Sequence, residues 1–196
     1  DINDPKLTAM DALLELRAQW PMLSMEVAVD TSDRLLSQLR DGVLEIVVGR
    51  PTGEDGDEYL FRAIDDEALS VVVGNEHPLA KAKTVAFKQL LPFGWVLQPS
   101  GSPMRALIDQ EFHEHHAPLP RDLIETGSIL TTMNLVRHSD MVGVIPQAVA
   151  KDNEEHGILR ILPCKFGRNL EAYGSLVRRD RPLSKPAQQF LELLHR

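Results

Sequence analysis

The sequence predicts an α/β fold built as two doubly wound lobes. Short apolar runs alternate along the chain with segments of helical periodicity. Most of these runs, such as VLEIVVG at 43–49, are continuous rather than alternating, which favours parallel strands covered on both faces. All of the predicted strands together would need one long sheet, and two smaller lobes fit 196 residues better. We therefore expect the chain to cross from a first lobe to a second and later return.

The first half of the chain predicts two helices and three strands. Apolar residues at 7–20 recur at near-helical spacing, so we expect a helix over 5–20 that ends at Pro21. Residues 24–30 (SMEVAVD) alternate with the period of a half-buried strand. A second helix starts at the capping residues 31–33 and ends at Gly42. Continuous strands follow at 43–49 and 68–80, the latter running into a turn, with an acidic loop at 51–59 between them.

The second half repeats the alternation. Strands are expected at 94–98, 122–126, 141–146, 158–164 and 172–179. Helices are expected at 104–115, after Ser128, from Pro146 as a first helical residue, and at 182–196. The chain has no internal repeat and no low-complexity segment.

Composition and charge exclude several functional classes. The 21 basic against 29 acidic residues give a net charge of −8, which repels a phosphate backbone and disfavours nucleic-acid binding by this chain itself. No apolar stretch approaches the roughly 20 residues that span a bilayer. The first residues lack the pattern of a secretory signal. The single cysteine, Cys164, suits a reducing cytoplasm and is expected to be a buried hydrophobe rather than a nucleophile.

Two loops have the features of ligand sites in α/β sheets. Strand 94–98 ends in Pro99-Ser100-Gly101-Ser102 before a helix, and strand 122–126 ends in Thr126-Gly127-Ser128 before the next. Each loop offers hydroxyls and free backbone N–H groups at a helix start, where the dipole favours a negative ligand. Ser and Thr are also the residues that cap any helix, so each loop has a purely structural interpretation as well.

Arg105 is placed against the helix dipole, in the first turn of the helix that follows Ser102. It either adds positive charge to an anion site built from N–H groups, or pairs with Asp109 four residues later. Its spacing does not decide between these roles.

No pattern predicts an enzyme, a metal site or a cofactor. Within His113-Glu114-His115-His116, His113 and His116 share a helix face, and a solvated helix end is favoured over a metal site. His138-Ser139-Asp140 lacks an activated serine motif, so no catalytic residue is assigned.

Four stretches, in their order and spacing, resemble the effector-binding domain of LysR-type transcriptional regulators. They are RLLSQLRDGVLEIVVGR (34–50), YLFRAIDDEALSVVVGNEHPLA (59–80), GSPMRALIDQEF (101–112) and ETGSILTTMNLVRHSDMVGVIPQAVA (125–150). The resemblance implies two α/β lobes like those of type-II periplasmic binding proteins, joined by two crossover strands. The crossings would fall near 71–75 and 174–177, with lobe I at 1–73 plus 177–196 and lobe II at 74–176.

The resemblance also implies a small effector in the interlobe cleft. Its implied contacts are Ser100, Gly101, Ser102, Thr126, Gly127 and Ser128, with backbone near Arg50 and Ile145. It implies a homodimer within a homotetramer, and DNA binding only through an N-terminal helix-turn-helix that this chain lacks. Only residues 1–4 precede Pro5, so the strand that opens this domain in the family is expected to be missing.

Two other classes remain as alternatives. A free-standing solute-binding protein of similar fold is disfavoured by the lack of a signal peptide or lipid-anchor cysteine. An enzyme is disfavoured because no paired carboxylates, metal ligands or nucleophile group stand out.

Overall fold

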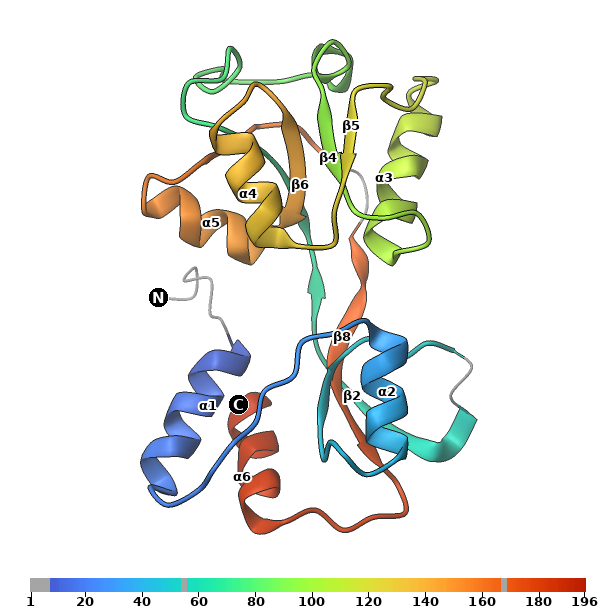
Figure 1. Ribbon diagram of the computed structural model, residues 1–196, viewed down its shortest axis with the longest axis vertical. Helices are drawn as coiled ribbons and strands as arrows, with labels where there is room; N and C mark the ends of the chain where they lie inside the picture. The colour runs from blue at the N-terminus through green and yellow to red at the C-terminus, as the bar shows by residue number, and fades with distance from the viewer. Residues whose placement is uncertain (1–7, 54–55, 167–168) are drawn as a thin grey trace. The chain divides into compact units, whose positions relative to one another are not determined.

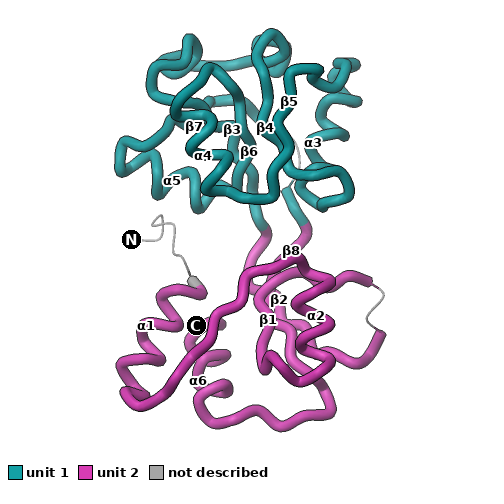
Figure 2. Tube along the Cα trace, in the orientation of Figure 1, with its two compact units in different colours: residues 1–5, 67–170 teal, residues 6–66, 171–196 magenta. Residues whose placement is uncertain are grey.

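The computed structural model describes residues 8–53, 56–166 and 169–196. These residues form two compact units, coloured separately in Figure 2. Unit 1 is the continuous segment 67–170, and unit 2 combines 8–66 with 171–196. The chain therefore leaves one unit and returns to it, as the sequence predicts. None of the described helices has the length and hydrophobicity to span a bilayer.

Unit 1 contains a mixed sheet of five strands within the described residues, in the order β5-β4-β6-β3-β7. The strands are β3 (Leu69–Val73), β4 (Trp95–Leu97), β5 (Leu123–Glu125), β6 (Val142–Pro146) and β7 (Arg160–Ile161). β4 runs parallel to both β5 and β6, whereas β3 pairs antiparallel with β6 and β7. The expectation of wholly parallel sheets is therefore correct only for β4, β5 and β6.

Helices cover both faces of this sheet (Figure 1). They are α3 (Pro103–Glu114), α4 (Ile129–Arg137) and α5 (Gln147–Glu155), with a short 3-10 turn at Phe87–Leu90. On one face, Phe112 of α3 packs edge-on against Trp95, with ring centroids 5.0 Å apart. On the other face, Val136 of α4 packs in a cluster with Val96. The alternation of Trp95 and Val96 along β4 thus divides the core of unit 1 into two layers.

Unit 2 has a smaller sheet, ordered β1-β8-β2. Its elements are α1 (Thr8–Gln19), α2 (Ser32–Arg40), β1 (Val47–Gly49), a 3-10 turn (Gly56–Glu58), β2 (Tyr59–Glu67), β8 (Leu170–Arg178) and α6 (Lys185–Leu194). α1 and α6 pack together through Leu16 and Leu194, while Leu36 and Leu39 of α2 pack on β1 and β8. β2 leads out of unit 2 and β8 leads back into it (Figure 2).

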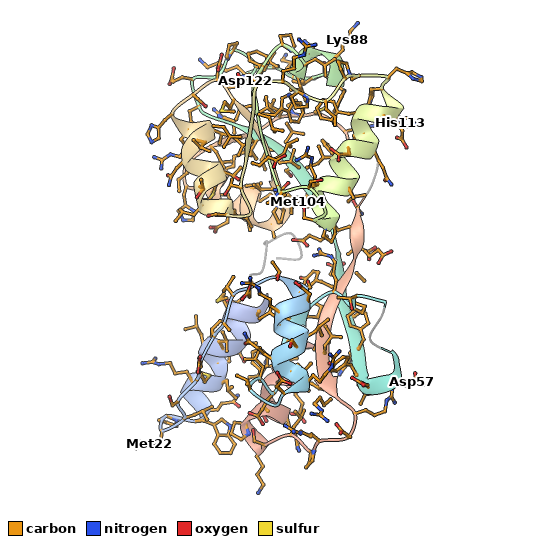
Figure 3. The ribbon with its side chains drawn as sticks, turned by 45° about the vertical axis from the view of Figure 1, so that its right-hand side comes forward. Met22, Asp57, Lys88, Met104, His113 and Asp122 are labelled. Carbon is orange, nitrogen blue, oxygen red and sulfur yellow. The ribbon has the colours of Figure 1, made fainter. Side chains whose placement is uncertain are left out.

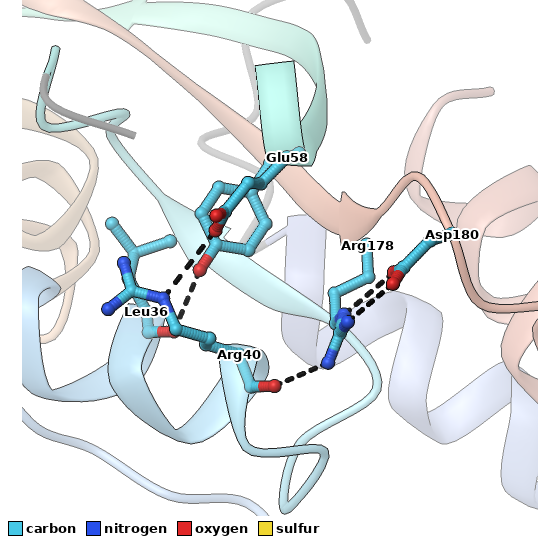
Figure 4. A network of polar contacts seen from close by, with 6 residues as sticks. Leu36, Arg40, Glu58, Arg178 and Asp180 are labelled. Carbon is cyan, nitrogen blue, oxygen red and sulfur yellow. Dashed lines mark hydrogen bonds and ion pairs between the residues drawn. The ribbon is translucent and has the colours of Figure 1, made fainter. Parts of the chain in front are cut away.

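Polar contacts fasten α2 to β8 and to β2 (Figure 4). Arg178 donates to the carbonyl of Arg40 in the last turn of α2 and also pairs with Asp180. The hydroxyl of Tyr59 donates to the carbonyl of Leu36 at 3.3 Å. A cation at the C-terminal end of a helix also offsets the helix dipole, so Arg178 stabilises α2 in two ways.

The turn after β3 is held by a buried neutral histidine. Nδ1 of His77 accepts a hydrogen bond from the backbone N–H of Leu79, which leaves Nε2 to donate to the carbonyl of Asp140 at 3.0 Å. Burial lowers the pKa of His77 and so favours this uncharged form. The His-Pro-Leu-Ala stretch thereby joins the end of β3 to the segment that enters β6.

The structure departs from the sequence prediction in several places. Residues 24–30 form no strand, and Val27 and Val29 are exposed. An alternating pattern becomes a strand only where another strand pairs with it, and none of the described strands does so. The sequence also failed to predict β2. Pro146 ends β6 and precedes α5, rather than being its first helical residue.

The boundaries between the two units also differ from those expected for the two lobes. They fall at 66/67 and 170/171, not at 73/74 and 176/177. The main reason is β3, which pairs with β6 from Leu69 to Val72 and so belongs to the sheet of unit 1. An apolar strand alone does not indicate which of two sheets it joins.

Gly174 provides a test of the packing in unit 2. A Cβ at Gly174 would lie 2.0 Å from the carbonyl oxygen of Arg62, whereas one at its cross-strand partner Gly49 would meet nothing closer than 3.7 Å. We expect Gly174→Ala to lower the free energy of unfolding by about 1–3 kcal/mol in urea titrations, because backbone must move. Gly49→Ala is the matched control and should change it by less than about 0.5 kcal/mol. Equal effects of the two substitutions would contradict the close approach of β2 and β8.

Candidate functional site

The carboxyl ends of β4 and β5 form a switch point in the sheet of unit 1. The two strands are parallel neighbours, but the chain leaves β4 for α3 on one face and β5 for α4 on the other. Figure 3 labels Met104 at the N-terminal end of α3 and His113 near its other end. In open α/β sheets, ligands bind in the crevice beyond such strand ends. The loops 99–102 and 126–128 both lie at this edge.

The first loop caps α3. The side-chain oxygen of Ser102 accepts a hydrogen bond from the backbone N–H of Arg105 at 3.1 Å, and Pro103 occupies the first helical position. Gly101 has φ +94°, which a residue with a side chain rarely adopts. Ser100 and Gly101 are exposed and Ser102 is half-buried. The predicted cap is confirmed.

The second loop caps α4 in the same way. Ser128 Oγ accepts from the backbone N–H of Thr131 at 3.2 Å, and Thr126 Oγ1 accepts from the N–H of Ser128 at 3.1 Å. A hydroxyl that accepts one bond still has its own hydrogen to donate. The first N–H groups of a helix also have no acceptor within it. The capping role of these residues is therefore compatible with ligand binding, and their contact with an effector stays a prediction.

Arg105 is buried, with only 7% of its surface exposed, and its guanidinium has three partners. Nε donates to Asp109 at 2.9 Å, and Nη1 donates to the carbonyl of Gln98 at 3.0 Å and to Glu125 at 2.9 Å. The hydrogen bond to Glu125, followed by that to Asp109, raises the pKa of Arg105. The pairing with Asp109 is thus confirmed, and a contact between Arg105 and an effector stays a prediction.

Gln98 is a residue that the sequence analysis did not single out. It is 8% exposed, and its Nε2 donates to the carbonyl of Val144 on β6 at 3.0 Å. Its Oε1 is buried and has no hydrogen-bond partner among the described residues. The signal was present in the sequence, since Gln98 is the one polar residue in the apolar run GWVLQ.

The other two predicted effector contacts, Ile145 and Arg50, differ in burial and belong to different units. The side chain of Ile145 is fully buried in the core beside Val96, so only its backbone is available to a ligand. Arg50 belongs to unit 2, where its Nε donates to the carbonyl of Glu171 at 3.1 Å. Participation of Arg50 in an effector site stays a prediction.

The histidines at the end of α3 are not grouped as metal ligands. His115 stacks on Phe87 with centroids 4.4 Å apart and lies 3.6 Å from Glu111. Within the described ranges, no group of three residues has the arrangement that could hold a metal ion. Cys164 is half-buried, and desolvation raises the pKa of its thiol, which disfavours the reactive thiolate.

The chain matches the family described as "LysR substrate binding domain" over residues 6–196. Among curated relatives, the HTH-type transcriptional regulator GbpR of Azospirillum brasilense is 33% identical over 176 residues, covering 89% of this chain and 52% of that protein. A probable nitrogen assimilation transcriptional activator of Synechococcus elongatus is 27% identical over 183 residues, covering 92% and 59%. The chain thus spans just over half the length of these relatives.

Solved structures confirm the fold. The effector-binding domain of QuiR in complex with shikimate matches with a TM-score of 0.75 at 14% identity, covering 96% of this chain and 89% of that one. The regulatory domain of CcmR from Synechocystis PCC6803, in complex with 2-PG, matches with a TM-score of 0.75 at 19% identity, covering 96% and 91%. The predicted two-lobed α/β fold, like that of periplasmic binding proteins, is therefore correct.

Removal of the Arg105 guanidinium tests its structural role. We expect Arg105→Met to lower the free energy of unfolding by about 1–3 kcal/mol, because the buried carbonyl of Gln98 loses its donor. Arg105→Lys should recover only part of this loss, since an ammonium lacks the planar fork of donors. Urea titration measures both variants.

The control is Arg137→Met, at an exposed arginine on α4. It should change the unfolding free energy by less than about 0.5 kcal/mol. If Arg105→Met were equally mild, the contacts of Arg105 would contribute nothing to the stability of unit 1.

Proposed function

Because the chain belongs to the LysR substrate-binding domain family, we propose that it is the effector-binding part of a transcription regulator. Its curated relatives are transcription regulators, which favours this function over a free-standing solute-binding protein. The family is regulatory rather than enzymatic, in agreement with the prediction that the chain is not an enzyme. DNA binding would reside in a helix-turn-helix domain outside this chain, and a role in transcription places the protein in the cytoplasm.

The effector binds at the carboxyl ends of β4 and β5. The observation that carries this proposal is the pair of helix N-termini, capped by Ser102 and Ser128, at one switch point. The positive ends of the two helix dipoles, with the first-turn N–H groups that the caps do not occupy, favour a small anionic or polar metabolite. Similar domains have been solved in complex with shikimate and with 2-PG.

Effector binding changes DNA binding only if the effector has different affinities for two conformations of the regulator. Within the described residues, the chain crosses between the two units at 66/67 and at 170/171. A change in their relative closure is therefore the proposed response, with Arg50 of unit 2 as the predicted second contact.

We also propose that this domain forms homodimers or homotetramers. Unit 2 exposes several large apolar side chains between residues 10 and 29: Met10, Leu14, Trp20, Met22, Val27 and Val29. Met10 and Leu14 are four residues apart on α1 and so share one helix face. Apolar side chains gathered in this way are typical of an interface.

A ligand screen tests the effector site. Small carboxylates and sugars are screened by thermal shift against the parent and against Ser102→Ala and Ser128→Ala. Each substitution removes a cap and should cost about 1 kcal/mol without ligand. The shift that a ligand induces, relative to each unliganded variant, should also fall, because hydroxyl contacts are lost.

Ser184→Ala is the matched control for this screen. Ser184 caps α6 in unit 2 by accepting a hydrogen bond from the backbone N–H of Ala187. Its replacement by alanine removes the same kind of capping bond at a position far along the chain from the candidate site. Its ligand-induced shift should equal that of the parent. Equal shifts in all three variants would place the ligand elsewhere, and catalytic turnover of a ligand would exclude a purely sensory role.

Leu14→Glu tests the apolar surface of unit 2. Leu14 is 64% exposed, so the substitution should leave the fold intact but place a charge in the interface. We expect a lower average mass in sedimentation equilibrium. Val43→Glu, at a residue 71% exposed elsewhere in unit 2, should leave the mass unchanged. A parent protein that sediments as a monomer would refute the proposed assembly.

A further inference from the structure

The unpaired side-chain oxygen of Gln98 is a buried acceptor beside the candidate site. Buried polar atoms in folded proteins are almost always hydrogen-bonded, so an exception needs an explanation. Among the buried side-chain atoms of the described residues, Gln98 Oε1 lacks a partner. Other buried polar side chains have one, including Arg105, Thr132 and Ser175.

The orientation of this amide is determined by its neighbour. The Gln98 Nε2 donates to the carbonyl of Val144 at 3.0 Å. Rotating the amide by half a turn would direct Oε1 at another acceptor, so the oxygen must occupy the unpaired position. Arg105 in turn holds the backbone carbonyl of Gln98 at 3.0 Å. Both ends of the residue are therefore fixed, and Oε1 is a preorganised acceptor.

The position of Gln98 places this acceptor near the first turn of α4. Val96 faces α4 from β4, and Gln98 lies two residues further on the same face. Thr132 of α4 lies over Gly143, the cross-strand partner of Val96. Ser128 lies one helical turn, about 5.4 Å, before Thr132 on α4. Gln98 lies two residues, about 6.6 Å, beyond Val96 along β4, and this displacement has the same direction because α4 runs antiparallel to β4. Gln98 and Ser128 therefore lie at the same level of unit 1.

We infer that Gln98 determines effector specificity by accepting a hydrogen bond from a hydroxyl group of an anionic ligand. This inference rests on the proposed function, because it adds a residue and a ligand class to the same site. An acceptor requires a donor, and a hydroxyl suits this place better than an ammonium, since the N-termini of α3 and α4 repel cations. The effector class is thus a small hydroxy acid, whose acid group binds the helix N–H groups.

Matched pairs of acids test this inference on the whole chain. The pairs are lactate with propionate and 3-hydroxybutyrate with butyrate, titrated by calorimetry against the parent and Gln98→Met. We expect the parent to prefer the hydroxy acid of at least one pair by about tenfold or more, as one good hydrogen bond would give. Gln98→Met should bind the two members of that pair within about twofold, because methionine keeps the length but supplies no comparable acceptor.

Gln188→Met is the matched control. The Nε2 of Gln188 donates to the carbonyl of Leu183 in unit 2. Gln188→Met therefore removes an amide-to-carbonyl hydrogen bond, as Gln98→Met does. It should keep the preference of the parent. A Gln98→Met protein that melts earlier but keeps the preference would give Gln98 a structural role only and overturn the inference.

The remaining outcomes separate this inference from the proposed function. Equal binding of both members of each pair by the parent overturns the role of Gln98 and leaves an effector site in place. If no acid of the panel binds at millimolar concentration while the wider screen finds a ligand sensitive to Ser102→Ala, hydroxy acids are the wrong class. If the wider screen finds no such ligand either, the proposed site fails as well.

Discussion

The candidate site depends on one buried guanidinium. Arg105 extends from the first turn of α3 to the carbonyl of Gln98 at the end of β4, to Glu125 at the end of β5, and to Asp109 one turn further along its own helix. These contacts fix the distance between two strand ends and the helix that starts between them. A cation in the first turn opposes the helix dipole. Two carboxylates offset that cost, and the result is a rigid base for both loops.

The same contacts identify where the attraction for an anion comes from. Arg105 carries one positive charge and is paired with two carboxylates, so this cluster is not a source of positive potential. In the proposed site, the attraction for an anion comes instead from the backbone N–H groups and dipoles of α3 and α4. In the proposed site, Arg105 holds the strand ends in place, and discrimination between ligands is assigned to Gln98 and the loop hydroxyls.

The sequence predicted the features that local chemistry determines. Ser102 and Ser128 were recognised as caps because Ser before an apolar helical pattern is a local signal, and the structure has both bonds. Features that depend on distant partners were missed. Residues 24–30 have the alternation of a strand but no described strand pairs with them, and β3 joined the sheet of unit 1 through β6. The apolar run GWVLQ marks Gln98 as a polar residue in a buried strand, but which of its amide atoms has a partner depends on where Val144 lies, 46 positions along the chain.

A net charge of −8 and a site for anions are physically compatible. At physiological ionic strength, charges separated by more than about 8 Å are largely screened, so the acidic surface contributes little at the bottom of a site. The N–H groups act at hydrogen-bond distance, where screening is weak. The surface charge instead disfavours polyanions such as nucleic acid, which contact many surface groups at once. In the proposed site, a small acid at the ends of β4 and β5 is selected by the donors and acceptors there. Gln98 Oε1 is the buried acceptor among them that has no partner within the described residues.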